Sequence, residues 1–302
     1  MAWASLVRRS IEAWGPSRRP ESAEVEKYLR ERTDLDEFLD KTSSTLMFWF
    51  FQRREVFLSQ QTMTKWEGDR LDDYVVFPVF PGFVTRDKCF FISHFWRQED
   101  HPDPNGEDLR LHQTSLTPAS WSYIWVDWSC LPQHPRSDIE EAYFRRALTT
   151  IPAIITNCRF TWFYPNFQPR LWILFEVAQY FLTTLAFRNP PDHVLPQDMR
   201  PFKRHIDEME QDGVQSVLAR YGYMASLDRD REYLTSWLDL IILLKRINLD
   251  VFGVRALCDN MALYPWMGGM TVSTANVTIE LRRWEGVLVV GQNTYTFKPV
   301  PE

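Results

Sequence analysis

The spacing of apolar and polar residues predicts helices in the first part of the chain. Residues 22–40 repeat apolar positions at helical intervals, with Glu24, Glu26 and Lys27 on the polar side. The run 46–51 is wholly apolar. It fits a buried helix or a buried strand, because periodicity does not separate the two in so short a run. We therefore expect an N-terminal helical extension over residues 1–85.

Residues 86–190 alternate between short apolar runs and amphipathic segments. Ser137, with Glu140 three residues later, has the spacing of a helix-capping box. The predicted strands are residues 89–94, 123–128 and 153–157, and the predicted helices are 107–115, 137–150 and the segment from 170. Strands rich in buried β-branched residues that alternate with helices are typical of a parallel sheet covered on both faces. This region is therefore predicted to be an α/β domain.

The pattern changes again over residues 191–302. Helical spacing is found at residues 202–221, at 229–247 and up to 263. Three short β-rich segments follow at 277–283, 287–290 and 294–297, separated by Gly286 and by the Gly291 turn. We expect an accessory region made of helices and a small β-meander.

Composition narrows the class of protein. The 302 residues are 45% hydrophobic, which is sufficient for buried cores, and the net charge of -6 argues against nucleic acid or an anionic membrane as partner. The apolar stretch 171–187 is short for a membrane span and contains Glu176. The four cysteines have no metal-site or disulfide spacing, so we expect reduced thiols, a cytoplasmic location and no metal.

Glu176 is the residue that most needs an explanation. It is the one carboxylate in the apolar segment 170–181, where an unpaired charge is costly. Trp172, Glu176, Gln179 and Thr183 share one narrow stripe of the predicted helix. Glu176 is either a functional carboxylate tuned by burial or one member of an ion pair. The candidate partners for such a pair are Arg97, Arg136 and Arg170.

Further polar residues are predicted at the ends of the first two strands. Ser93 and His94 end the first, and Asp127 ends the second. Ligands of open parallel sheets bind beyond the carboxyl ends of the strands, so these residues are candidates for a binding edge. The simpler interpretation is that they hold the following loops through backbone hydrogen bonds.

Two other clusters favour a structural interpretation. His94, Asp100, His101 and Asp103 surround a proline-containing loop and lack the spacing of a metal site. Cys130 and His134 have no third group to orient them as a nucleophile and base. The chain also lacks GxGxxG, GxxxxGK[ST], HExxH and GxSxG, which removes the main support for several common enzyme classes.

Residues 86–188 resemble Toll/interleukin-1 receptor (TIR) domains. The motifs are Phe91-Ile92-Ser93-His94 at the first strand, Trp125-Val126-Asp127-Trp128 at the second and the loop 129–136. The segment Trp172-x-x-x-Glu176 is similar to the Trp-x-x-x-Glu of NAD-cleaving members. Ser93-His94-Phe95-Trp96, together with Trp125-x-Asp127 and Pro132-Gln133, also resembles the related fungal heterokaryon-incompatibility proteins. The proline-rich loop after the first strand and the missing glycine after the second depart from the TIR pattern.

The resemblance implies a flavodoxin/TIR-like core and cleavage of the nicotinamide–ribose bond of NAD. NAD, or a related nucleotide, is then the substrate, with no separate cofactor. It implies Glu176 as the catalytic residue and a set of substrate-binding residues, namely Trp172, Ser93, His94, Asp127, Trp96 and Arg136. It also implies a role in defence or cell-death signalling and self-association through the TIR-like domain.

Two alternatives remain open. The chain is a non-catalytic TIR-like module for protein interaction in signalling, or it is another N-glycosidic enzyme such as a nucleoside hydrolase or deoxyribosyltransferase. The sequence assigns no role to residues 191–302.

Overall fold

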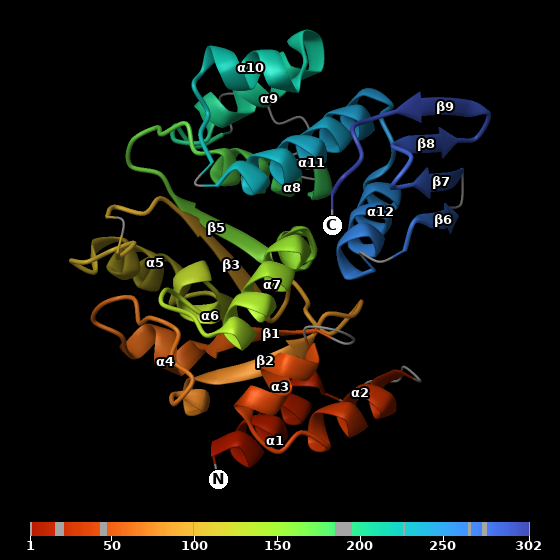
Figure 1. The fold of residues 1–302 in the computed structure, drawn as a ribbon. Helices are drawn as coiled ribbons and strands as arrows, with labels where there is room; N and C mark the ends of the chain where they lie inside the picture. The colour runs from red at the N-terminus through yellow and green to blue at the C-terminus, as the bar shows by residue number, and fades with distance from the viewer. Residues whose placement is uncertain are drawn as a thin grey trace. The chain divides into compact units, whose positions relative to one another are not determined.

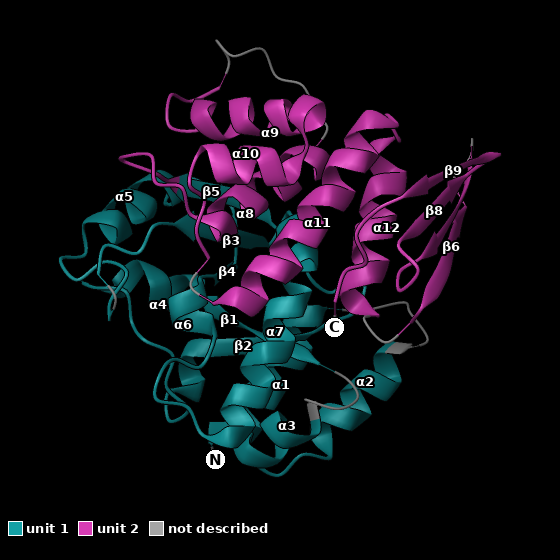
Figure 2. Cartoon of the chain, turned by 45° about the horizontal axis from the view of Figure 1, so that its top comes forward, with its two compact units in different colours: residues 1–162 teal, residues 163–302 magenta. Residues whose placement is uncertain are grey.

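The chain divides into two compact units, residues 1–162 and 163–302, called unit 1 and unit 2 (Figure 2). The computed structural model describes residues 2–15, 21–42, 47–98, 100–184, 195–225, 227–264, 267–273 and 277–301. The division between the units falls between Trp162 and Phe163, before the last residue of the strand Arg159–Phe163, whereas we expected domain boundaries at 85/86 and 190/191. Residues 190 and 191 lie outside the described residues.

A five-stranded mixed sheet forms the centre of unit 1 (Figure 1). Its strands are β1 (Phe48–Arg53), β2 (Tyr74–Pro78), β3 (Cys89–His94), β4 (Tyr123–Trp125) and β5 (Arg159–Phe163), in the order β2-β1-β4-β3-β5. β3 and β4 are parallel, whereas β1 runs antiparallel to β2 and to β4. The predicted α/β class is confirmed. The parallel sheet expected for residues 86–190 is present in the pair β3–β4, and the whole sheet is mixed because β1 and β2 join it in antiparallel orientation. The ambiguous run at 46–51 supplies β1, so a region predicted to be helical contributes two strands.

The helices of unit 1 are α1 (Ala2–Trp14), α2 (Glu21–Arg30), α3 (Leu35–Thr42), α4 (Arg54–Ser59), α5 (Glu107–Leu116), α6 (Asp127–Cys130) and α7 (Asp138–Asn157), with a 3-10 turn η1 (Leu71–Asp73). The single helix expected at 22–40 is therefore two helices. The Asp34 carboxylate accepts a hydrogen bond from the backbone N–H of Glu37 at 2.9 Å, which caps a new helix start.

α7 begins as predicted and ends later than predicted. Ser137 and Glu140 form the expected capping box. The helix then continues through Pro152 to Asn157, so the predicted strand at 153–157 is wrong and the next strand is β5. Residues 151–156 are all buried, and a helix that is buried on every side has no amphipathic pattern to distinguish it from a strand.

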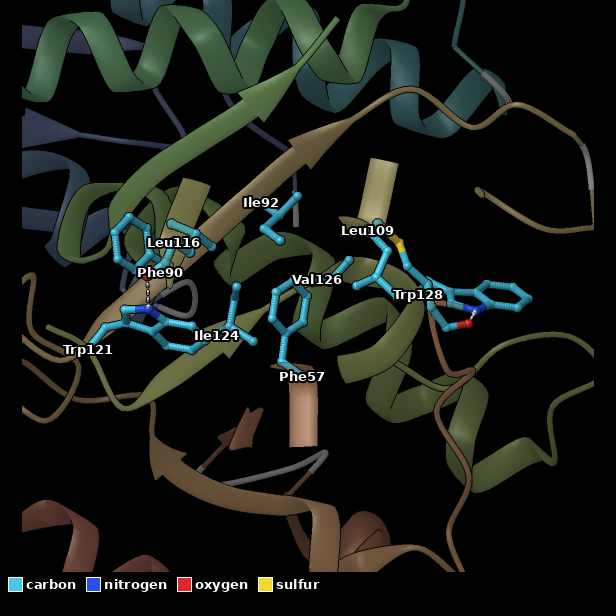
Figure 3. Close-up of a cluster of buried hydrophobic side chains, with 10 residues drawn as sticks. Phe57, Phe90, Ile92, Leu109, Leu116, Trp121, Ile124, Val126 and Trp128 are labelled. Carbon is cyan, nitrogen blue, oxygen red and sulfur yellow. Dashed lines mark hydrogen bonds between the residues drawn. The ribbon is translucent and has the colours of Figure 1, made fainter. Parts of the chain in front are cut away.

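An apolar cluster supports β3 and β4 on one face of the sheet (Figure 3). Phe90 and Ile92 of β3 lie in it with Ile124 and Val126 from β4 and the residue after it. Trp121 and Trp128 lie at opposite ends of the cluster (Figure 3). The Trp128 indole N–H donates to the Met63 carbonyl at 3.1 Å, which fixes the side chain next to Asp127 in the chain.

Unit 2 contains five helices and a second sheet among its described residues. The helices are α8 (Leu171–Thr183), α9 (Arg200–Asp212), α10 (Val214–Arg220), α11 (Asp228–Arg246) and α12 (Val251–Leu263). The strands β6 (Gly269–Ser273), β7 (Thr278–Arg282), β8 (Val287–Val290) and β9 (Asn293–Thr296) form an antiparallel meander in chain order. The predicted meander is confirmed, with β6 as an additional strand.

α8 is the helix against which three other helices of unit 2 pack. It contacts α9, α11 and α12. The single helix expected at 202–221 is interrupted by Gly213, which separates α9 from α10 with φ 85° and ψ 153°. Within the described residues, no helix has both the length and the apolar character needed to cross a bilayer.

Candidate functional site

Residues at the ends of β3 and β4 meet in unit 1, as the sequence predicts. Because the two strands are parallel neighbours, their carboxyl ends lie at the same edge of the sheet. His94 is the last residue of β3, and Asp127 is the first residue of α6, just after β4. The His94 Nε2 atom lies 3.0 Å from Asp127 Oδ1. Ser93 and His94 are both buried.

Asp127 joins the two sequence motifs. The Trp96 indole N–H donates to Asp127 Oδ2 at 3.0 Å, and the backbone N–H of Trp128 donates to Oδ1 at 2.6 Å. The backbone carbonyl of Asp127 accepts a hydrogen bond from the Gln133 amide at 2.9 Å. The Ser-His-x-Trp segment and the Trp-x-Asp segment with its Pro-Gln are therefore linked through one residue.

These contacts keep the Asp127 carboxyl ionised. Burial raises the pKa of an aspartate, but the hydrogen bond and charge of His94, with the N–H groups of Trp96 and Trp128, outweigh it. The net effect is a lowered pKa for Asp127. Its side chain is 39% exposed, whereas the side chain of His94 is 2% exposed. Asp127, rather than His94, is thus the accessible member of the pair.

Aromatic rings and a loop surround this pair. Trp96 packs edge-on against Trp128 with ring centroids 5.3 Å apart, and the His101 ring lies 5.1 Å from that of Trp128. Asp103 is fully buried and caps α5 by accepting hydrogen bonds from the backbone N–H groups of Glu107 and Leu109. His101 and Asp103 thus build the loop. No three His, Cys, Asp or Glu side chains of the described residues are arranged to hold a metal ion.

The thiol of Cys130 is poorly suited to act as a nucleophile. It is fully buried, and burial raises its pKa to about 12. His134, which the sequence places near it without the third group of a catalytic triad, is exposed. The structure thus supports a packing role for Cys130.

Arg136 has a local structural role. Its guanidinium pairs with Glu141 at 3.0 Å, donates to the Pro132 carbonyl at 2.6 Å and lies 3.4 Å above the Phe144 ring. These contacts fasten the loop before α7. Arg97, another predicted partner of Glu176, pairs with Asp108 at 2.6 Å and with Glu107 at the start of α5.

Trp172 and Glu176 differ from every other residue of α8. Both are half-buried, and all the remaining residues of the helix are buried. They are four residues apart and therefore lie on the same face. The predicted stripe does not continue as an accessible surface, because Gln179 and Thr183 are completely buried.

A residue that the sequence did not indicate contacts this stripe. The Trp172 indole N–H donates to Asp230 Oδ2 of α11 at 3.2 Å, and the Asp230 side chain is 11% exposed. Asp230 stands in the mixed-charge run Asp-Arg-Asp-Arg, which is typical of a solvated helix start. The sequence therefore carries no signal for the contact.

The predicted site residues form two groups. His94, Trp96 and Asp127 are joined by hydrogen bonds in unit 1, with Ser93 beside them in the chain. Trp172 and Glu176 share a face of α8 in unit 2.

No family model, no curated protein and no solved structure matches this chain.

Proposed function

We propose that this protein cleaves the nicotinamide–ribose bond of NAD and that Glu176 is the catalytic carboxylate. One observation carries the proposal. Along α8, only the Trp172–Glu176 pair keeps partial exposure, while the rest of the helix is buried. A carboxylate at the border of an apolar helix, with an aromatic ring one turn away, suits the binding of a sugar next to a flat base.

The proposed reaction uses water as the second substrate. The bond between the ribose C1′ carbon and the nicotinamide nitrogen breaks, and nicotinamide leaves with the bonding electrons. Positive charge develops on the ribose, where the Glu176 carboxylate stabilises it and accepts hydrogen bonds from the ribose hydroxyls. Water then adds to C1′ and releases one proton. Trp172 shapes the pocket.

The residues at the ends of β3 and β4 form a separate candidate binding group within unit 1. The exposed part of the Asp127 carboxylate is available for contact, while His94 and Trp96 hold it in place. Ser93 and Arg136 remain proposed contacts. A TIR-like core is also part of the proposal, and the parallel pair β3–β4 with motifs at both strand ends supports it.

The test is nicotinamide release from NAD by the purified full chain. Glu176→Gln keeps the size of the side chain and removes its charge, so we expect kcat to fall about 100-fold or more. Glu232→Gln on α11 is the matched control, because Glu232 is a 62% exposed glutamate of the same unit. Unchanged turnover in Glu176→Gln overturns the assignment of Glu176.

A non-catalytic interaction module is the second candidate. Two observations favour it. The Asp127 carboxylate accepts hydrogen bonds from several groups of the protein itself, and His94 is buried, so the motifs of unit 1 are suited to a structural role. Concentration-dependent assembly, measured by sedimentation, without turnover of NAD at any concentration would favour it. A parallel screen of nucleosides and nucleotides for base release tests for other N-glycosidic activity.

A further inference from the structure

The Trp172 ring is restrained from two directions in unit 2. Its indole N–H donates to Asp230 on α11 at 3.2 Å. Phe175 packs edge-on against it, with ring centroids 6.0 Å apart and the planes at 84°. Phe175 belongs to the same helix as Trp172, so Asp230 supplies the restraint that comes from another element.

The Asp230 carboxylate is placed to act on the ring and not only on its own helix. Its side chain is 11% exposed, and the Nε atom of the neighbouring Arg229 lies 3.8 Å from Oδ1, beyond hydrogen-bond distance. A hydrogen bond to an ionised acceptor is stronger than one between neutral groups, and more so away from water. Asp230 therefore favours one orientation of the Trp172 indole.

The simpler explanation is that Asp230 only stabilises the start of α11. It lies in the first turn, where an acidic side chain interacts favourably with the helix dipole. Asp228 lies in the same turn, carries the same charge and is exposed. The two aspartates share the effect on the helix end, so the contact with Trp172 distinguishes Asp230 from Asp228.

We propose that Asp230 is a positioning residue for the candidate site, which holds the Trp172 indole beside Glu176 and makes α11 part of the site. The catalytic consequence rests on the proposed function, whereas the positioning of Trp172 does not. The proposal gives a role to the C-terminal region, to which the sequence assigned none.

The first experiment follows the Trp172 indole N–H by NMR in the full chain, assigned by its loss in Trp172→Phe. We expect Asp230→Ala to shift this resonance and to speed its hydrogen exchange about 3- to 10-fold, while Asp230→Asn, which retains an acceptor oxygen, preserves it. Asp228→Ala is the matched control and should leave it unchanged. An unaltered resonance in Asp230→Ala overturns the positioning role, whether or not the protein cleaves NAD.

The second experiment is a double-mutant cycle on the KM for NAD. We expect Asp230→Ala to raise KM about 3- to 10-fold with a smaller change in kcat, and Asp230→Asn to restore it. In the Trp172→Phe background, Asp230→Ala should have no further effect, because the residue acts through the indole. An equal rise in KM in both backgrounds contradicts action through Trp172. Absence of turnover in the wild type removes the proposed function and leaves the NMR result to decide the positioning role.

Discussion

A single carboxylate, that of Asp127, accepts hydrogen bonds from three donors in different parts of unit 1. His94 is on β3, Trp96 is in the loop that follows, and the backbone N–H of Trp128 is in α6. Removal of the carboxylate takes a hydrogen-bond partner from the Trp96 indole N–H and from the buried His94 ring. The energetic cost of losing Asp127 is therefore mainly the cost of these lost hydrogen bonds.

We expect Asp127→Ala to lower the free energy of unfolding by about 1–3 kcal/mol, near the lower limit because water reaches the partly exposed site. The lowered pKa of Asp127 sets the pH dependence. A carboxyl with a folded-state pKa below its unfolded value of about 3.9 stabilises the protein above that value, and the effect is lost as pH falls through the folded-state pKa.

Denaturant unfolding at neutral pH and at successively lower pH measures both effects. The difference in the free energy of unfolding between wild type and Asp127→Ala should be largest at neutral pH and should shrink at acidic pH. Asp100→Ala, an exposed aspartate of the neighbouring loop, is the control and should change stability little at either pH. Equal stability of the two variants contradicts a central role for Asp127.

Among the helices and strands, the break between α9 and α10 has the clearest cause. Gly213 has φ 85° and ψ 153°, a backbone conformation that is essentially restricted to glycine. A Cβ atom at this position meets no other atom within 4 Å. The constraint therefore comes from the backbone and not from crowding.

Gly213→Ala should therefore lower the free energy of unfolding by about 1–3 kcal/mol through backbone strain. Ser216→Ala in α10 serves as the control, because Ser216 is exposed and alanine favours helix. Thermal or denaturant unfolding measures both variants. A Gly213→Ala protein at least as stable as the wild type would mean that α9 and α10 continue as one helix.

Where elements have a local chemical signal, the sequence predicts them. The capping box at Ser137 predicts the start of α7, and the apolar run of 89–94 predicts β3. The errors occur where tertiary burial removes the signal. The end of α7 is buried on all sides and is indistinguishable from a strand, and β1 has the same ambiguity. Gly213 stands within a helical pattern, and the sequence alone does not show that its backbone conformation ends α9 there.

The candidate site shows the same limit. The ends of parallel strands must share an edge, so the proximity of His94 and Asp127 follows from the sequence. The contact between Trp172 and Asp230 joins residues 58 positions apart, and no local pattern predicts it. Such contacts depend on how α8 and α11 pack, which is decided by the shapes of their apolar faces.

On the scale of the whole molecule, the reactivity of the four cysteines can measure the opening of each unit separately. Cys89, Cys130 and Cys158 are buried in unit 1, and Cys258 is buried in unit 2. Burial raises the pKa of Cys258 to about 12, and it raises the pKa of Cys158 as well. Their reaction with a thiol reagent therefore requires local opening of the unit that contains them.

We expect pulse labelling with a thiol reagent, read by site-resolved mass spectrometry, to separate the units. Gly213→Ala should speed the labelling of Cys258 more than that of Cys130, and Asp127→Ala should do the opposite, because each change weakens its own core. The matched variants Ser216→Ala and Asp100→Ala should leave both rates near those of the wild type. Parallel changes at all four cysteines would mean that the chain opens as one cooperative body.

The linkage of three side chains through Asp127 has an evolutionary consequence. A lineage that replaces this aspartate removes the carboxylate that His94 and Trp96 share, so both side chains lose part of their selective advantage together with it. The three positions are therefore expected to covary when homologous sequences are compared. Chains that lack the aspartate should also have lost the tryptophan, whereas Gln133, which donates to the backbone carbonyl, should vary independently of it.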